Sequence, residues 1–205
     1  LQPYLKEIAV LLLQRLQNSR TERYVKKFVV FLGVLSYKLG SDFVIQFIDE
    51  VQGGLFQQIW SNFVIPTLPI IGNLLDRKIA LVGALNVVTG GSTFSNKYAP
   101  LLPITLDAIL RTAASESIVN MKSELVDLEN LEEISTFGSS FSKLASISEK
   151  PFDPLPQVDL TQGVKTYIAQ TLVKFNQTSD NALFTNVAPQ LSEDAKKALN
   201  LMGIN

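Results

Sequence analysis

The sequence predicts an all-α protein, an α-solenoid in which antiparallel helix pairs stack side by side. Apolar residues recur at helical spacing along most of the chain, and no sustained alternation of apolar and polar residues indicates a strand. Short polar breaks separate the apolar runs, so consecutive helices should pack as antiparallel neighbours. The stretch 79–88 is apolar on nearly every side, so it must be buried between neighbours on both sides, as in a stacked array.

The first three helices follow from apolar spacing and from signals at their ends. One helix covers 5–16, the next covers 25–39, and a third begins at Ser41 and Asp42, after Gly40. The apolar stripe of the first helix has no earlier partner in the chain, so we expect it to pack against a preceding repeat of a longer protein. That stripe consists of Leu5, Ile8, Leu12 and Leu16. A chain that begins inside a helical pattern, and not with Met, is also typical of an excised piece.

Two segments with helical spacing each contain two prolines three residues apart, Pro66 with Pro69 and Pro100 with Pro103. A proline inside a helix removes one backbone donor and costs about 3 kcal/mol. We expect each pair to kink or break the first helix of a helix pair, at equivalent places in successive repeats. The alternative interpretation is that the prolines mark loops before helices.

The composition changes after the second proline pair. Between Arg111 and Lys143 there are six acidic residues and a single basic one, Lys122. We expect an acidic insertion over 112–136, for which two interpretations stay open. It is either a solvated insertion between repeats, as charge-biased segments usually are, or an anionic arm for a basic partner. In the second interpretation, the partner-binding candidates are Glu124, Asp127, Glu129, Glu132 and Glu133.

The C-terminal part begins with a proline-rich link over 149–159. The last strong helix follows at 159–176, with an aspartate as its capping residue. We divide the chain after that helix. Residues 1–176 should form about four helical repeats, and residues 177–205 a capping loop with a short helix that covers the end of the stack.

Composition excludes several classes of function. The chain of 205 residues has a net charge of −1, so no global basic field favours nucleic acid, and no apolar stretch is convincing as a membrane span. It contains no His and no Cys, which removes His-based catalytic triads, most zinc sites and disulfides. We therefore expect no enzyme activity, no catalytic residue, no metal, no cofactor, and neither nucleic acid nor membrane as a partner. Trp60 is expected in the core or at a helix edge.

The segment 63–88 resembles a HEAT repeat. It has an apolar helix with an internal proline, an acidic residue in the expected turn (Asp76), a basic residue after it (Lys78), and a second helix rich in Ala and Gly. The expected turn over 76–78 is shorter by a residue or two than the general pattern. This resemblance implies a HEAT-repeat α-solenoid, a right-handed superhelix of antiparallel helix pairs.

Three stretches carry a more specific resemblance: "LLLQRLQNSRTERYVKKFVVFLGVLSYKLG" at 11–40, "FVIPTLPIIGNLLDRKIALVGALNVVTGG" at 63–91, and "FGSSFSKLASISEKPFDPLP" at 137–156. Their order and spacing resemble the C-terminal end of the karyopherin-β exportins that return importin-α to the cytoplasm. The resemblance covers most of residues 5–176.

The resemblance implies a protein-binding scaffold within a nuclear export receptor. Such a receptor binds importin-α together with RanGTP, contacts nuclear pore proteins in transit, and shuttles between nucleus and cytoplasm. RanGTP would be held mainly by parts of the parent outside this chain. Importin-α carries a strongly basic N-terminal segment, which favours the acidic insertion as its binding arm. The alternative function is a HEAT-repeat scaffold subunit of another complex, such as a phosphatase or a chromatin-associated assembly.

Overall fold

The structure is a computed structural model that describes residues 4–115, 152–160, 162–179, 181 and 183–204. Every regular element in these ranges is helical, which confirms the all-α prediction. The α-helices are α1 (Leu5–Asn18), α2 (Glu22–Leu39), α3 (Ser41–Asp49), α4 (Leu55–Ile59), α5 (Ile65–Thr67), α6 (Leu74–Thr89), α7 (Ser92–Lys97), α8 (Leu102–Ala114), α10 (Gln162–Thr178) and α11 (Glu193–Leu201). Helical turns of π or 3-10 type lie at Trp60–Val64, Leu68–Ile70, Ala99–Leu101, Leu183–Val187 and Ala188–Gln190.

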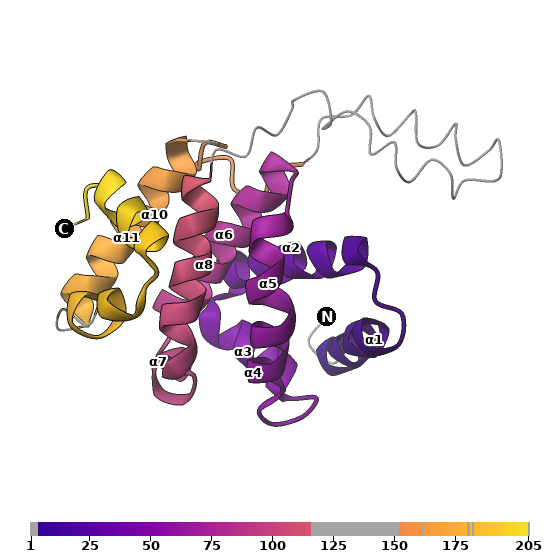
Figure 1. The fold of residues 1–205 in the computed structure, drawn as a ribbon. Helices are drawn as coiled ribbons and strands as arrows, with labels where there is room; N and C mark the ends of the chain where they lie inside the picture. Colours follow the sequence, from indigo (N-terminus) through magenta and orange to yellow (C-terminus); the bar gives the residue numbers. More distant parts are fainter. Residues whose placement is uncertain (1–3, 116–151, 161, 180, 182, 205) are drawn as a thin grey trace, which may run out of the picture.

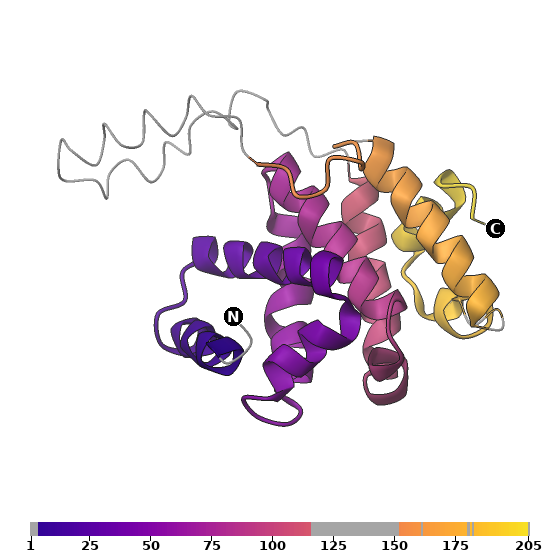
Figure 2. The same ribbon diagram turned by 180° about the vertical axis from the view of Figure 1, so that it is seen from behind.

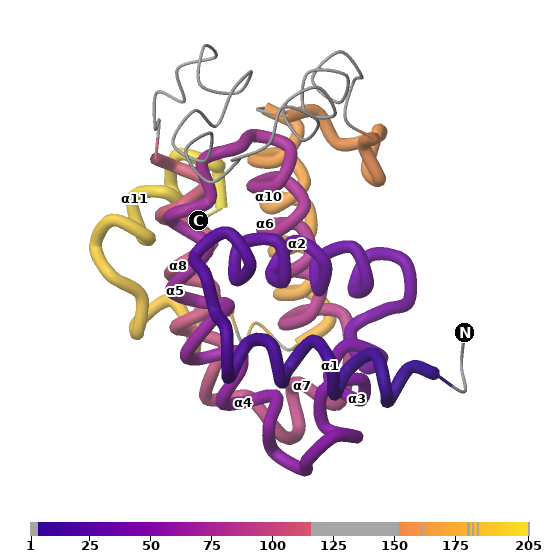
Figure 3. Tube along the Cα trace, turned by 90° about the vertical axis from the view of Figure 1, so that its right-hand side faces the viewer, coloured from indigo at the N-terminus to yellow at the C-terminus, as the bar shows by residue number. Residues whose placement is uncertain are grey.

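The helices form two layers. Helix α6 contacts α2 on one side and α10 on the other, so these three make one layer, nearer the viewer in Figure 2. Helix α8 contacts α5 and α11, which make the second layer, nearer the viewer in Figure 1. Figure 3 shows the two layers from the side, while α1 lies apart from them near α3. This arrangement is the stacked array that the apolar pattern predicts.

Helix α6 is the centre of the stack. All but one of the residues from Arg77 to Val88 are buried, Asn86 being the exception, which confirms the expected burial of 79–88. The α2 and α6 backbones meet at two glycines. A Cβ atom added to Gly83 would lie 2.2 Å from the Cα of Gly33, so only glycine permits this approach. The hydroxyl of Ser36 in α2 donates to the carbonyl oxygen of Gly83 in α6 at 2.9 Å, and this hydrogen bond stabilises the crossing of the two helices.

The start of α6 corrects the interpretation of 76–78 as a turn. The helix begins at Leu74, and the side chain of Asn73 caps it by accepting a hydrogen bond from the backbone N–H of Asp76 at 3.0 Å. Asp76 therefore lies in the first helical turn, where it pairs with Lys27 of α2 at 2.6 Å. An Asn followed three residues later by an acid is a helix-start signal that outweighs the polarity of this stretch.

The two proline pairs are not equivalent, contrary to expectation. The first lies in a helical run from Leu55 to Ile70 that changes from α to π geometry before Pro66 and to 3-10 geometry around Pro69. Regular α-helical geometry is thus interrupted on both sides of Pro66, at the place where the sequence predicts a kink or a break. Pro100 and Pro103 lie in the first turns of the 3-10 segment and of α8. A missing N–H costs little there, so the second pair marks a helix start, as the alternative interpretation holds.

Helix α1 also differs from expectation. Leu16 is buried, and Leu5, Ile8 and Leu12 pack partly against the core of this same chain, so the stripe does not lack a partner. The hydroxyl of Tyr24 in α2 donates to the carbonyl oxygen of Leu12 at 2.7 Å and fixes the contact. In the C-terminal part, the helix expected at 159–176 runs from Gln162 to Thr178.

Trp60 is a core residue, as expected. Its side chain is 1% exposed, and its indole N–H donates to the hydroxyl oxygen of Thr105 at 2.9 Å. The ring stacks on Phe56, with ring centres 5.0 Å apart, and meets Phe94 edge to face. This cluster joins the helical run from Leu55 to Ile70 to α7 and α8.

Candidate partner-binding site

The acidic residues predicted to bind a partner, Glu124, Asp127, Glu129, Glu132 and Glu133, lie outside the described residues. The described chain stops at Ser115, just after α8, and resumes at Phe152, where the aromatic side chain is 85% exposed. Both of these flanking positions are near the N-terminal end of α6. The site is therefore described from α6 outward.

Arg77 of α6 forms hydrogen bonds with the C-terminal end of α8. Its guanidinium donates to the carbonyl oxygen of Thr112 and to the hydroxyl and carbonyl oxygens of Ser115. Only 9% of the Arg77 surface is exposed, and this burial lowers the pKa of the guanidinium. The arginine therefore holds the point at which the chain leaves α8.

Lys78, the next residue of α6, binds the segment before α10 through an ion pair and hydrogen bonds. Its ammonium is 1% exposed and has three acceptors: the Asp153 carboxylate at 2.6 Å, the Val158 carbonyl at 2.7 Å and the Leu155 carbonyl at 3.0 Å. Three donors meet three acceptors, which offsets the cost of burying the charge. Desolvation raises the pKa of the Asp153 carboxyl, but hydrogen bonds from Lys78 and the Leu155 N–H outweigh it, so the pKa is lowered overall.

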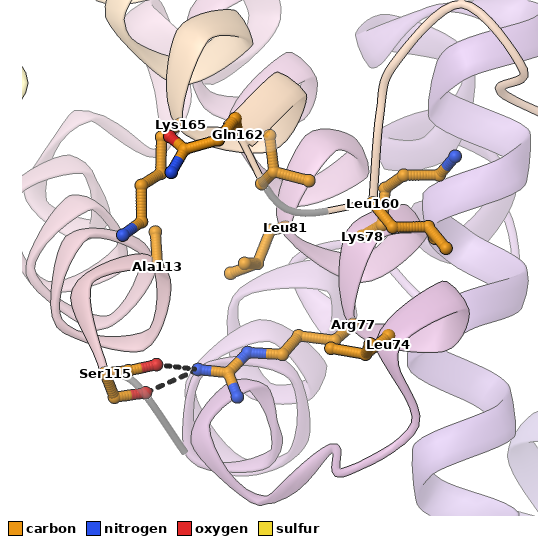
Figure 4. Close-up of a pocket in the computed structure, with 10 residues that line it drawn as sticks. Leu74, Arg77, Lys78, Leu81, Ala113, Ser115, Leu160, Gln162 and Lys165 are labelled. Atoms are coloured by element: carbon orange, nitrogen blue, oxygen red, sulfur yellow. Dashed lines mark hydrogen bonds between the residues drawn. The ribbon is translucent and has the colours of Figure 1, made fainter. Parts of the chain in front are cut away.

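A pocket of about 220 Å³ lies beside these two anchors (Figure 4). It is formed by the N-terminal half of α6, the first turn of α10, the end of α8, and Leu160 from the segment before α10. Apolar side chains make most of its walls, while Arg77, Lys78 and Lys165 supply positive charge. Figure 4 shows the two hydrogen bonds of Arg77 to Ser115 at its edge. Such a pocket suits a ligand with both apolar and anionic groups.

The sequence interpretation missed these three basic residues. Arg77 and Lys78 are expected in a turn over 76–78, whereas both lie inside α6, and their acceptors are 35 or more positions away in the sequence. Lys165 carried a weaker signal, since α10 contains Lys165 and Lys174 and no acidic residue. Two basic residues of α2, by contrast, form ion pairs: Lys26 pairs with Glu22 and Lys27 with Asp76.

In the described ranges, no group of three or more acidic residues is placed to hold a metal ion. None of the helices seen there combines the length and the apolar character needed to cross a membrane. The described chemistry is thus that of a helical scaffold with paired charges between its elements and one mixed apolar and cationic pocket.

Comparison with known proteins places the chain in a family. The sequence profile described as "CAS/CSE protein, C-terminus" matches residues 1–201. The "Importin alpha re-exporter" of Saccharomyces cerevisiae is 62% identical over 200 residues, covering 98% of this chain and 21% of that protein. The re-exporter of Schizosaccharomyces pombe is 29% identical over 216 residues, and human "Exportin-2" is 26% identical over 201 residues. Those two matches cover 99% and 96% of this chain, and 22% and 20% of the relatives.

A solved structure titled "The exportin Cse1 in its cargo-free, cytoplasmic state" agrees with the fold over 100% of this chain and 20% of that chain, with a TM-score of 0.82 and 54% identity. The chain thus spans about a fifth of the length of these relatives. Their names describe transport and not catalysis. The chain belongs to the CAS/CSE protein family and corresponds to its C-terminal region.

Proposed function

We propose that this chain is the C-terminal section of a nuclear export receptor that binds importin-α with RanGTP and returns it to the cytoplasm. The observation that carries the proposal is the match of the whole chain, in sequence and in fold, to a named importin alpha re-exporter and to the exportin Cse1. The section acts as a protein-binding scaffold and not as an enzyme. RanGTP is bound mainly by other parts of the receptor, which passes the nuclear pore and shuttles between nucleus and cytoplasm.

We also propose that the stack ends within this chain, with residues 1–176 as HEAT repeats and residues 177–205 as the cap. Helix α11 supports this division, because it contacts α8 and has one apolar and one polar face. Ala195, Ala198 and Leu199 are buried, while Glu193 and Asp194 are exposed. A terminal unit of a solenoid needs such a polar outer face.

A pull-down with purified components tests the proposed function. The intact receptor is immobilised and offered importin-α with Ran loaded with GTP, with Ran loaded with GDP, or without Ran. We expect importin-α to be retained in the presence of RanGTP and largely absent in the other two cases. Equal retention in all three cases, or none, would favour the alternative of a HEAT scaffold for another complex.

A further inference from the structure

The pocket beside α6 has an unbalanced charge. Among the residues that the structure describes, ten line it, and these include three cations, Arg77, Lys78 and Lys165, and no carboxylate. The Lys78 ammonium is paired with Asp153, which is not among the lining residues, and the Arg77 guanidinium is hydrogen-bonded to Thr112 and Ser115. A positive charge with no ionic partner among the described residues, as at Lys165, attracts anionic groups more strongly in a partly enclosed site than on an open surface.

Lys165 is the main source of the excess positive charge in the pocket. It lies in the first turn of α10, its side chain is half-buried, and it forms no hydrogen bond or ion pair with any described residue. Figure 4 shows it on the rim near Ala113, on the opposite side of the pocket from Leu160. The N-terminal end of a 17-residue helix adds a partial positive charge at this point.

The apolar walls of the pocket favour a ligand that also carries an apolar group. Leu74, Leu81 and Val164 line it, and Leu160 is 42% exposed at its edge. A volume of about 220 Å³ is below the range of about 300–1,000 Å³ that is usual for cofactors and drug-sized ligands. It has room for one or two side chains of a peptide. A simple inorganic anion would leave the apolar walls unused.

We propose that this pocket binds an acidic peptide segment of a protein partner. An apolar side chain of that segment enters between α6 and α10, and the neighbouring carboxylates pair with Lys165 and approach Arg77. The inference rests on charge complementarity and on the mixed lining of the pocket, and it holds whether or not that partner is importin-α.

The test measures binding of a fluorescein-labelled octapeptide of six glutamates and two leucines to the intact receptor by fluorescence anisotropy. The receptor carries Lys165→Glu or Ala113→Leu. The first variant reverses the unpaired charge, and the second fills the pocket without changing any charge. The matched controls are Lys174→Glu, on the same helix but outside the pocket lining, and Ala114→Leu, next to Ala113 but outside the lining.

We expect Lys165→Glu and Ala113→Leu each to weaken binding about tenfold or more, and the two controls to change it less than about twofold. A peptide with glutamines in place of glutamates should bind at least about tenfold more weakly, and inorganic phosphate at 10 mM should not displace the acidic peptide.

Several results would overturn the proposal. One is equal binding by Lys165→Glu and Lys174→Glu, and another is no measurable binding by the unaltered receptor. Displacement by phosphate would show a site for small anions. If neutralising the five acidic residues between Glu124 and Glu133 raised the affinity for the peptide, the chain's own acidic segment would be the occupant, and the partner assignment would be wrong.

Discussion

Single residues decide how closely the helices of this stack approach one another. At the crossing of α2 and α6, Gly83 leaves no space for a methyl group against Gly33, whereas a Cβ atom at Gly72 meets nothing within 4 Å. We expect Gly83→Ala to lower the free energy of unfolding by about 1–3 kcal/mol or more, because the backbones must separate. Gly72→Ala should change it by less than about 1 kcal/mol. Urea unfolding followed by circular dichroism measures both, and equal effects would show that the crossing is looser than described.

The contribution of an ion pair to stability likewise depends on how deeply its side chains are buried. Lys78 and Lys27 both form an ion pair at 2.6 Å, but the side chain of Lys78 is 1% exposed and that of Lys27 is 62% exposed. Lys78→Met removes three hydrogen bonds and leaves their acceptors near α6 without a donor, so we expect a loss of about 3 kcal/mol. Lys27→Met should cost less than about 1 kcal/mol.

Hydrogen exchange provides a second measurement for the same pair of variants. The backbone N–H groups of Leu155 and Val158 are bonded to Asp153 and to the carbonyl of Leu155 within the segment that Lys78 holds. Lys78→Met should speed exchange at these two amides, and Lys27→Met should not. Unchanged exchange after Lys78→Met would mean that the segment is held by its apolar contacts alone.

At the scale of elements, three aspartates join helices that are distant in sequence. Asp49 at the end of α3 accepts hydrogen bonds from Lys97 at 2.7 Å, from the hydroxyl of Tyr98, and from the backbone N–H of Phe56 at 2.9 Å. Asp107 of α8 accepts the backbone N–H of Ser192 at 2.8 Å, where α11 begins. Asp153 meets Lys78 of α6. Burial raises the pKa of each of these carboxyls, but their hydrogen bonds and nearby cations lower it more, to below the ordinary value of 3.8.

The pH dependence of stability follows from these lowered pKa values. A carboxyl with a lower pKa in the folded state stabilises the fold above its unfolded pKa, and this stabilisation is lost as the pH falls through the folded value. The free energy of unfolding should therefore decrease from about pH 4 downward. Asp49→Asn should make that decrease shallower, and Asp194→Asn, on the exposed face of α11, should not. Denaturant unfolding at a series of pH values checks this, and identical acid limbs for all three proteins would contradict it.

Sequence patterns predicted elements well where one local signal dominated. The apolar run of α6 and the departure from regular α-helical geometry near Pro66 are of this kind. The start of α6 was missed because polarity at 76–78 was weighed above the cap at Asn73. The burial of Lys78 could not be predicted, since its acceptors lie 75 or more positions further along the chain.

At the scale of the whole molecule, the resemblance in the sequence indicated the family, while the layers and the pocket required the structure. The pocket joins the starts of α6 and α10 with the end of α8, and no local pattern shows that these ends meet. The predicted acidic site stays a prediction, because its five residues lie outside the described ranges.

That acidic site makes its own kinetic prediction for the intact receptor. We propose that the carboxylates of Glu124, Asp127, Glu129, Glu132 and Glu133 speed encounter with basic importin-α, since charges act over about 8 Å at physiological ionic strength. Replacing all five by Gln or Asn should slow association and flatten its salt dependence, with a smaller effect on dissociation. Stopped-flow or surface-based kinetics at two salt concentrations give both rates. An unchanged association rate and salt slope would identify the segment as a solvated insertion.

The proposed export function requires that importin-α and RanGTP bind the receptor cooperatively. The most direct measurement is the dissociation constant of the intact receptor for importin-α in the presence of RanGTP and of RanGDP, by titration calorimetry or anisotropy. We predict binding at least about tenfold tighter with RanGTP, and RanGTP binding tightened by the same factor with importin-α, because coupling between two sites is reciprocal. Equal dissociation constants with RanGTP and RanGDP would contradict the assignment of this chain to an importin-α export receptor.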